Sequence, residues 1–131
     1  IERLKACIDS VHGALAAGGV FCFNAVDKQR IDNASFVSHS AQHGEGQFRF
    51  SSGWYYRGEG EQQALRLRIE RSVAEQTEVW HDEHPMVAVD FAELQSLLAP
   101  YFEVQVLEHD YQRLAPWGGG SGNALFACTK R

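Results

Sequence analysis

Residues 15–26 read Leu-Ala-Ala-Gly-Gly-Val-Phe-Cys-Phe-Asn-Ala-Val, and this stretch decides the fold. The two glycines end a helix, since glycine takes the left-handed conformation that closes a helix at little steric cost. The apolar run that follows, residues 20–26, is rich in aromatic and β-branched side chains, which is typical of a strand buried on both faces. The stretch therefore predicts a helix, a turn and a strand that lies centrally in a helix-covered sheet.

The segments outside this stretch extend the α/β pattern. Residues 1–16 carry apolar side chains at helical spacing, which predicts an amphipathic helix. Near the other end, Asp90 and Glu93 have the spacing of a capping box and predict a helix that starts there. Residues 102–108 alternate as a strand, and the apolar run 124–128 predicts a last buried strand, which we expect antiparallel beside the first one.

The middle of the chain has a different texture. Residues 28–47 are polar and irregular, which predicts a long loop with a short helix near 34–37. Residues 47–88 alternate polar and apolar side chains, most clearly over 65–73, and predict an antiparallel meander with one buried and one wet face.

Composition limits the class of protein. The 131 residues are 44% hydrophobic, which is enough for one domain with a core, and no apolar run approaches the roughly 20 residues needed to span a bilayer. The net charge of -5 argues against nucleic acid as the main partner. Cys22 and Cys128 lie in apolar runs and Cys7 is far from both, so we expect buried, reduced thiols and a cytoplasmic protein.

Two groups of histidines raise the question of a metal. His81 and His84 flank two carboxylates, and His39 and His43 are four residues apart. Pro85 disfavours a helix that presents His81 and His84 together, and neither spacing matches a zinc pattern. We therefore expect no metal site.

Several of these segments resemble class I S-adenosylmethionine-dependent methyltransferases. Residues 15–21 are similar to the Leu-x-Pro-Gly-Gly-x-hydrophobic turn that leads into the fifth strand of that family, with Ala17 in place of the proline. Residues 91–98 and 101–104 resemble the family's last helix and the entry into its sixth strand, and residues 125–130 are similar to its seventh strand.

The resemblance implies an α/β fold: the C-terminal half of a seven-stranded doubly wound methyltransferase sheet with an antiparallel lid insertion. It divides the chain into a helix and buried strand (1–27), a lid insertion (28–89), and the last helix with an antiparallel strand pair (90–131). Many small-molecule members of the family carry an antiparallel lid at this position, and residues 47–88 resemble one.

The cofactor implied by the resemblance is S-adenosylmethionine, but its site is expected to lie mostly outside these residues. The family's glycine-rich loop after the first strand and the acidic residue after the second strand are missing here. The glycine run 118–122 lies between two strands and lacks a following helix, so we interpret it as a surface connection. We expect either a missing N-terminal half or a homodimer to cover the edge of strand 20–26.

The implied function is transfer of a methyl group from S-adenosylmethionine to a small-molecule acceptor. Such an enzyme aligns the acceptor with the methyl group and, in some members, deprotonates it. The candidates for that catalytic role are His84, His81 and Tyr55. Candidates for substrate binding are polar residues at the end of the first strand and aromatic residues elsewhere: Asn24, Asp27, Trp54, Tyr56, Trp80 and Trp117.

Two other functions stay open. One is a free-standing α+β domain that binds a small ligand in an apolar cavity, although a single curved sheet would alternate throughout, unlike the runs 20–26 and 124–128. The other is a non-catalytic partner subunit that keeps only the lid half of the fold.

Overall fold

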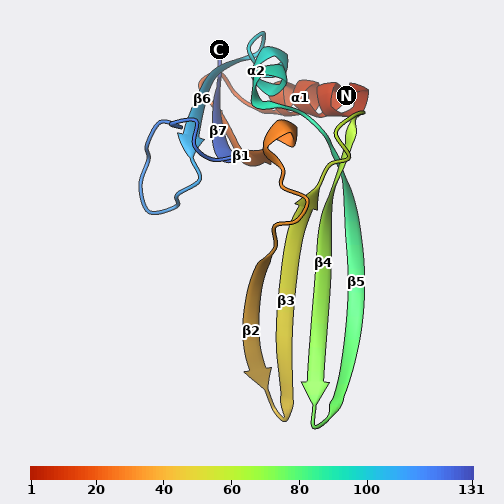
Figure 1. Ribbon diagram of the computed structural model, residues 1–131. Coiled ribbons are helices and arrows are strands. Elements are labelled where there is room, and N and C mark those ends of the chain that lie inside the picture. Colours follow the sequence, from red (N-terminus) through yellow and green to blue (C-terminus); the bar gives the residue numbers. More distant parts are fainter. The chain divides into compact units, whose positions relative to one another are not determined.

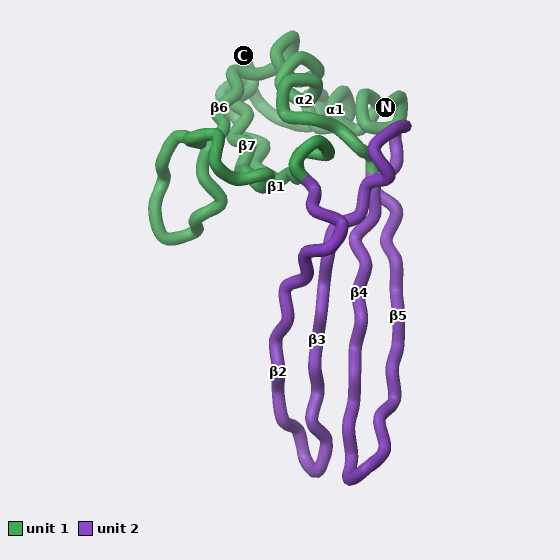
Figure 2. The backbone as a smooth tube through the Cα atoms, in the orientation of Figure 1, with its two compact units in different colours: residues 1–30, 87–131 green, residues 31–86 purple.

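The computed structural model describes residues 1–131 and divides into two compact units. Unit 1 comprises residues 1–30 and 87–131, and unit 2 comprises residues 31–86 (Figure 2). In chain order the elements are α1 (Glu2–Ala14), β1 (Val20–Val26), the 3-10 turn η1 (Lys28–Arg30), β2 (Val37–His43), β3 (Gly46–Tyr55), β4 (Gln62–Val73), β5 (Gln76–Val87), α2 (Phe91–Leu98), β6 (Phe102–Glu108) and β7 (Asn123–Lys130) (Figure 1). Neither α-helix combines the length and apolar character that a membrane crossing requires.

Unit 1 is built on a three-stranded antiparallel sheet with the order β1-β7-β6. Phe126 of β7 lies opposite Phe23 of β1 on one side and Val106 of β6 on the other, which confirms the predicted antiparallel pairing of 20–26 with 124–128. The central strand, however, is β7. The prediction that strand 20–26 is central was wrong, because β1 pairs on one side only and forms an edge.

The prediction that β1 is buried on both faces was also wrong. Its side chains alternate: Phe21 and Phe23 pack against the core, whereas Val20 is 58% exposed and Cys22 is exposed. The physical reason is that α1 and α2 pack on the same face of the sheet (Figure 1). Of the two thiols that were expected to be buried, only Cys128 is, and all three cysteines are free.

The core of unit 1 forms between the two helices and the sheet. Ile8 of α1 and Leu98 of α2 are buried together with Phe102, Phe126 and Cys128 from the strands. The Phe126 ring, which is fully buried, stacks on Phe23 with ring centroids 5.4 Å apart. Removing a ring of this kind costs about 3–5 kcal/mol of stability.

Helix α2 begins with the predicted capping box, which is confirmed. The Asp90 carboxylate accepts a hydrogen bond of 2.7 Å from the Glu93 backbone N–H, and the Asp90 backbone N–H donates one of 2.9 Å to the Glu93 carboxylate. Lys28 of η1 also pairs with Glu93, its Nζ lying 2.8 Å from Oε2. The hydrogen bond from Lys28, together with the one from the Asp90 backbone, lowers the pKa of Glu93. The start of α2 is therefore tied to the end of β1.

Unit 2 is a four-stranded antiparallel sheet with the order β2-β3-β4-β5, so the predicted antiparallel meander is confirmed. The expectation that one of its faces is buried was wrong, because Val37, Phe50 and Trp80 are exposed. The predicted loop over 28–47 was wrong, because residues 37–43 form β2. The short helix expected near 34–37 is absent as well, and a 3-10 turn forms at Lys28–Arg30 instead. All residues of β2 are exposed, so backbone hydrogen bonds to β3 hold this edge strand in place. Backbone pairing of this kind leaves no alternation of apolar side chains in the sequence.

The two faces of the unit 2 sheet differ in character. The pairing of β2, β3 and β4 fixes which side chains share a face, and the contacts Arg71–Glu78, Ser72–Thr77 and Arg66–Glu83 extend the assignment to β5. The apolar face consists of Val37, His39, Ala41, Phe48, Phe50, Ser52, Trp54, Leu65, Leu67, Ile69, Arg71, Glu78, Trp80, Asp82 and His84. The polar face consists of Ser38, Ser40, Gln42, Gln47, Arg49, Ser51, Tyr55, Arg66, Arg68, Glu70, Ser72, Thr77, Val79, His81 and Glu83.

Candidate functional site

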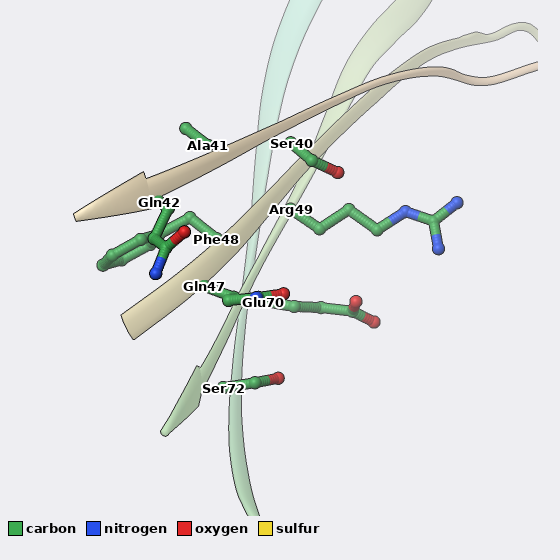
Figure 3. Close-up of a pocket in the computed structure, with 8 residues that line it drawn as sticks. All are labelled: Ser40, Ala41, Gln42, Gln47, Phe48, Arg49, Glu70 and Ser72. Carbon is green, nitrogen blue, oxygen red and sulfur yellow. The ribbon is translucent and has the colours of Figure 1, made fainter. Parts of the chain in front are cut away.

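The polar face of unit 2 carries a pocket of about 380 Å³ near the β2–β3 turn. Figure 3 shows Arg49 and Glu70 pointing to the same side of the strands, whereas Phe48 points to the opposite side. Arg49 and Glu70 are cross-strand partners, and Arg68 also pairs with Glu70. This pocket therefore offers hydrogen-bonding groups on an open surface and few apolar contacts.

A second pocket, of about 450 Å³, lies at the other end of the strands and contains one predicted catalytic residue, Tyr55. The guanidinium of Arg66 lies 3.8 Å from the centre of the Tyr55 ring, and its Nε lies 3.1 Å from Glu83 Oε2. Glu59 and Glu61 of the β3–β4 connection also line the pocket. Arg57 lines the pocket as well, so the pocket offers both hydrogen-bond acceptors and donors to a polar ligand.

The three predicted catalytic residues do not share one surface. Tyr55 belongs to the polar face, and alternation along β5 places His81 there as well. His84 belongs to the apolar face, where its Nε2 lies 3.2 Å from Asp82 Oδ2 and its side chain is 50% exposed. No single acceptor on this sheet can contact all three, so at most two act together.

The predicted aromatic substrate contacts in unit 2 also separate. Trp54 and Trp80 lie on the apolar face, and Trp80 is 48% exposed. Tyr56 follows β3, where its backbone exchanges two hydrogen bonds with the Asn33 side chain. Its hydroxyl donates to the Gly60 carbonyl at 3.0 Å, so the Tyr56 side chain braces the β3–β4 connection.

The other predicted substrate residues belong to unit 1, at and after the end of β1. Asn24 is exposed, whereas Asp27 is only 7% exposed. One oxygen of Asp27 accepts a hydrogen bond of 2.9 Å from the Gln29 backbone, and the other lies 3.5 Å from the Phe91 backbone N–H at the start of α2. Asp27 thus joins the end of β1 to α2, and this bracing is the role its contacts display.

Trp117 lies in the β6–β7 connection and packs against α2. Its ring meets Phe91 edge-on with centroids 5.0 Å apart, and its Nε1 donates to the Ser121 carbonyl at 3.0 Å. The Arg30 guanidinium lies 5.1 Å from the Trp117 ring centre and also donates to the Gly119 carbonyl. The predicted contact residue is therefore part of a braced loop.

Sequence reasoning missed Arg66, Glu83 and Arg30. The alternation of residues 65–73 marks Arg66 as outward-facing, but only the β3–β4 register reveals that it covers Tyr55. Nothing in the sequence connects Arg30 with Trp117, because residues 31–116 lie between them and the contact depends on the folded loop.

No group of three or more histidine, cysteine or carboxylate side chains is arranged to hold a metal ion. No family model matches the chain, and no curated protein matches it. Solved structures do resemble it. One of them is the S-adenosylmethionine-bound amino pentose methyltransferase CalS10 from Micromonospora echinaspora, with a TM-score of 0.72 at 15% sequence identity. The match covers 98% of this chain and 50% of the CalS10 chain.

Two further structures agree. DesVI from Streptomyces venezuelae has a TM-score of 0.70 at 19% identity, and the sugar N-methyltransferase KedS8 from Streptoalloteichus has one of 0.68 at 12% identity. They match 99% and 98% of this chain but only 52% and 49% of their own lengths. The chain has half of a methyltransferase fold.

The share of each structure that is covered is consistent with the C-terminal half of this fold, as the sequence indicated. Of the seven-stranded sheet that we expected, residues 1–131 form three strands, β1, β7 and β6, together with the antiparallel unit 2. The chain spans about half the length of the solved methyltransferases that it matches.

The residues present do not fit S-adenosylmethionine by themselves. The glycine run 118–122 is followed by β7 and not by a helix, so no helix N-terminus stands beside it. Gly118 donates its backbone N–H to Glu108 at 2.8 Å, which directs this amide to a carboxylate of the protein. The glycine run 118–122 therefore forms no cradle of this kind for the cofactor.

Proposed function

We propose that residues 1–131 form the acceptor-binding half of an S-adenosylmethionine-dependent methyltransferase that acts on a small polar acceptor of the amino sugar type. The observation that carries this proposal is the fold shared over nearly the whole chain with CalS10 and KedS8, an amino pentose methyltransferase and a sugar N-methyltransferase. The carboxylate-lined pocket at Tyr55 supports it independently.

The proposed acceptor site is this pocket. Glu83, which is held by Arg66, accepts hydrogen bonds from the acceptor and favours a cationic amine beside it. The Tyr55 ring, covered by Arg66 on one side, offers an apolar surface of the kind on which the C–H face of a sugar ring packs. Unit 2 acts in this proposal as the lid over the acceptor.

Methyl transfer to an amine requires a free electron pair on nitrogen, so a proton must leave an ammonium acceptor. His81 is the proposed base for an acceptor on the polar face, the face to which Tyr55 also belongs. His84, with Trp54 and Trp80, is the second candidate set, on the opposite face. There, Asp82 holds His84 Nε2 at 3.2 Å, which leaves Nδ1 to take the proton.

In unit 1 we propose three further residues that contact the substrate: Asn24, Asp27 and Trp117. The cofactor half is proposed to lie outside residues 1–131 and to pair with the free edge of β1, since unpaired backbone groups at a sheet edge attract another strand. S-adenosylmethionine would supply the methyl group from that half.

Nuclear magnetic resonance titration of the labelled chain with glucosamine tests the acceptor site, with glucose as the probe that lacks the ammonium group. We expect saturable shifts centred on Tyr55, Ala64 and Glu83 and a preference of about tenfold for glucosamine, because a charge-assisted hydrogen bond is worth about 1.5–3 kcal/mol. Glu83→Gln removes the preference, whereas Glu70→Gln, in the other pocket, preserves it. Shifts confined to other surfaces would refute the site.

A further inference from the structure

Phe36 is an exposed phenylalanine on the polar face of unit 2. It comes directly before β2 and is 62% exposed. A Cβ added at Gly53 of β3 would lie 2.8 Å from the Phe36 Cδ1, so the ring lies directly over this glycine. Gly53 pairs with Arg66 of β4, which places its empty side-chain position on the polar face. The glycine therefore leaves the space into which the Phe36 ring leans.

The segment that leads into β2 holds this ring in position. Asp32 Oδ1 accepts a hydrogen bond of 3.0 Å from the Ala34 backbone N–H, and its Oδ2 accepts one of 2.8 Å from the Ser35 hydroxyl. The Asn33 side chain exchanges two hydrogen bonds with the Tyr56 backbone, at 2.8 and 2.9 Å. An ordered turn thus presents the ring, and a ligand that binds to it pays little for ordering of the chain.

The ring borders the proposed acceptor site. Gly53 precedes Tyr55 by two residues on β3, so both positions belong to the polar face. The contact between Arg66 and Glu83 sets the register of β4 with β5, and His81 lies two residues before Glu83 on the same face. An acceptor that extends from Tyr55 towards His81 therefore crosses the row of side chains that contains Gly53.

Shielding of Gly53 accounts for only one side of the Phe36 ring. Aromatic side chains are known to cover glycines on neighbouring strands, but here the other side of the ring stays in solvent. The next polar-face side chains on β2 and β3, Ser38 and Ser51, lie 3.0 Å apart as a hydrogen-bonded pair and offer the ring no apolar partner. The ring is therefore an apolar surface among hydrogen-bonding groups, an arrangement that suits a ligand with both kinds of surface.

We propose that Phe36 is a specificity-determining residue of the acceptor site and packs against an apolar C–H face of the acceptor. This role rests on the proposed function, because it requires the acceptor to occupy the pocket at Tyr55. Glu83 then recognises the amine, and Phe36 selects acceptors that also present an apolar surface. A small polar amine binds to Glu83 without reaching the ring.

Nuclear magnetic resonance titration with two amines tests this role. Glucosamine has a ring with C–H faces and an ammonium group, whereas 2-aminoethanol has the ammonium group without a ring. We expect Phe36→Ala to weaken glucosamine binding about tenfold and to change 2-aminoethanol binding by less than about twofold, because only glucosamine reaches the aromatic ring. Phe36→Tyr keeps the flat ring and should restore most of the glucosamine affinity. Phe50→Ala is the matched control, since Phe50 is 41% exposed on the opposite face of the sheet, and it should leave both affinities unchanged.

Circular dichroism checks that Phe36→Ala folds, because loss of the ring uncovers Gly53. If it does not fold, Phe36→Leu keeps an apolar side chain over the glycine and should weaken glucosamine binding about threefold.

Three outcomes would overturn the role of Phe36. Unchanged glucosamine affinity in Phe36→Ala, with the dependence on Glu83 retained, would overturn this role and leave the proposed function intact. Equal weakening of both amines would overturn it too, because Phe36 would then act only on the fold of the site. Absence of saturable glucosamine binding to the unmodified chain would overturn the proposed acceptor site together with the role of Phe36.

Discussion

Cys128 illustrates how position in the fold governs the chemistry of a single residue. It lies in the central strand β7 with none of its surface exposed, and burial raises the pKa of its thiol to about 11. Cys7 and Cys22 are exposed. Because the thiolate is the reactive form, an alkylating reagent at pH 8 should modify two thiols of the folded chain and leave Cys128 intact. Mass spectrometry counts the adducts, and three adducts on native protein would contradict the burial described.

The raised pKa of Cys128 also predicts a dependence of stability on pH. The folded state keeps the proton above the ordinary thiol pKa of about 9, whereas the unfolded state loses it. The contribution is therefore constant below pH 9, and stability falls as the pH rises from 9 towards 11. Denaturant melts of the unmodified chain and of Cys128→Ala across this range should show a steeper decline for the unmodified chain.

Gly122 is a residue where only glycine fits. A Cβ there would lie 2.8 Å from the Arg30 Cβ, and the Gly122 carbonyl accepts a hydrogen bond from the Asp27 backbone. We expect Gly122→Ala to lower the free energy of unfolding by about 1–3 kcal/mol, because this crowding forces the backbone to shift. Gly120→Ala is the matched control in the same loop, since its Cβ would meet no atom within 4 Å. Equal stabilities for the two variants would show that the contact is absent.

At the scale of elements, the capping box of α2 makes a measurable contribution. Asp90→Ala removes the acceptor for the Glu93 backbone N–H and for the Gln29 side chain, so we expect a loss of about 1 kcal/mol in the free energy of unfolding. Asp90→Asn retains a side-chain oxygen and should keep most of that stability. Urea denaturation measures both, and an Asp90→Ala variant as stable as the unmodified chain would contradict the assignment.

Some elements were predictable from sequence because their signals are local. The capping box predicted the start of α2, and the glycine turn together with the apolar run after it predicted the observed bounds of β1. Strand β2 left no signal, because all its side chains are exposed and backbone pairing alone defines it. The burial of β1 was overestimated because an apolar run does not reveal how many faces of a sheet the helices cover.

The same distinction applies to the candidate site. The sequence indicated Tyr55. The position of Arg66 over the Tyr55 ring depends on the pairing of β3 with β4, and the nearby carboxylates come from β5 and from the β3–β4 connection. It also offered His81, His84 and Tyr55 as alternative candidates for one catalytic role, and the sheet separates them onto two faces. Side-chain types are legible in a sequence, whereas the face on which each one lies depends on the register.

At the scale of the whole molecule, the proposed enzyme binds its acceptor and its cofactor in different parts of the chain. Residues 1–131 have half of a methyltransferase fold, carry a pocket suited to a polar acceptor, and lack a glycine-rich turn that leads into a helix. The acceptor and the cofactor are therefore proposed to bind to different halves of the complete enzyme.

Calorimetric titration of the 131-residue chain with S-adenosylmethionine tests this division most directly. The account predicts no saturable heat at micromolar concentrations of the cofactor, because the residues described here offer no cradle for it. Glucosamine titrated into the same sample serves as the comparison and should bind. Saturable, micromolar binding of S-adenosylmethionine to this chain would contradict the account, because it would place the cofactor site within residues 1–131.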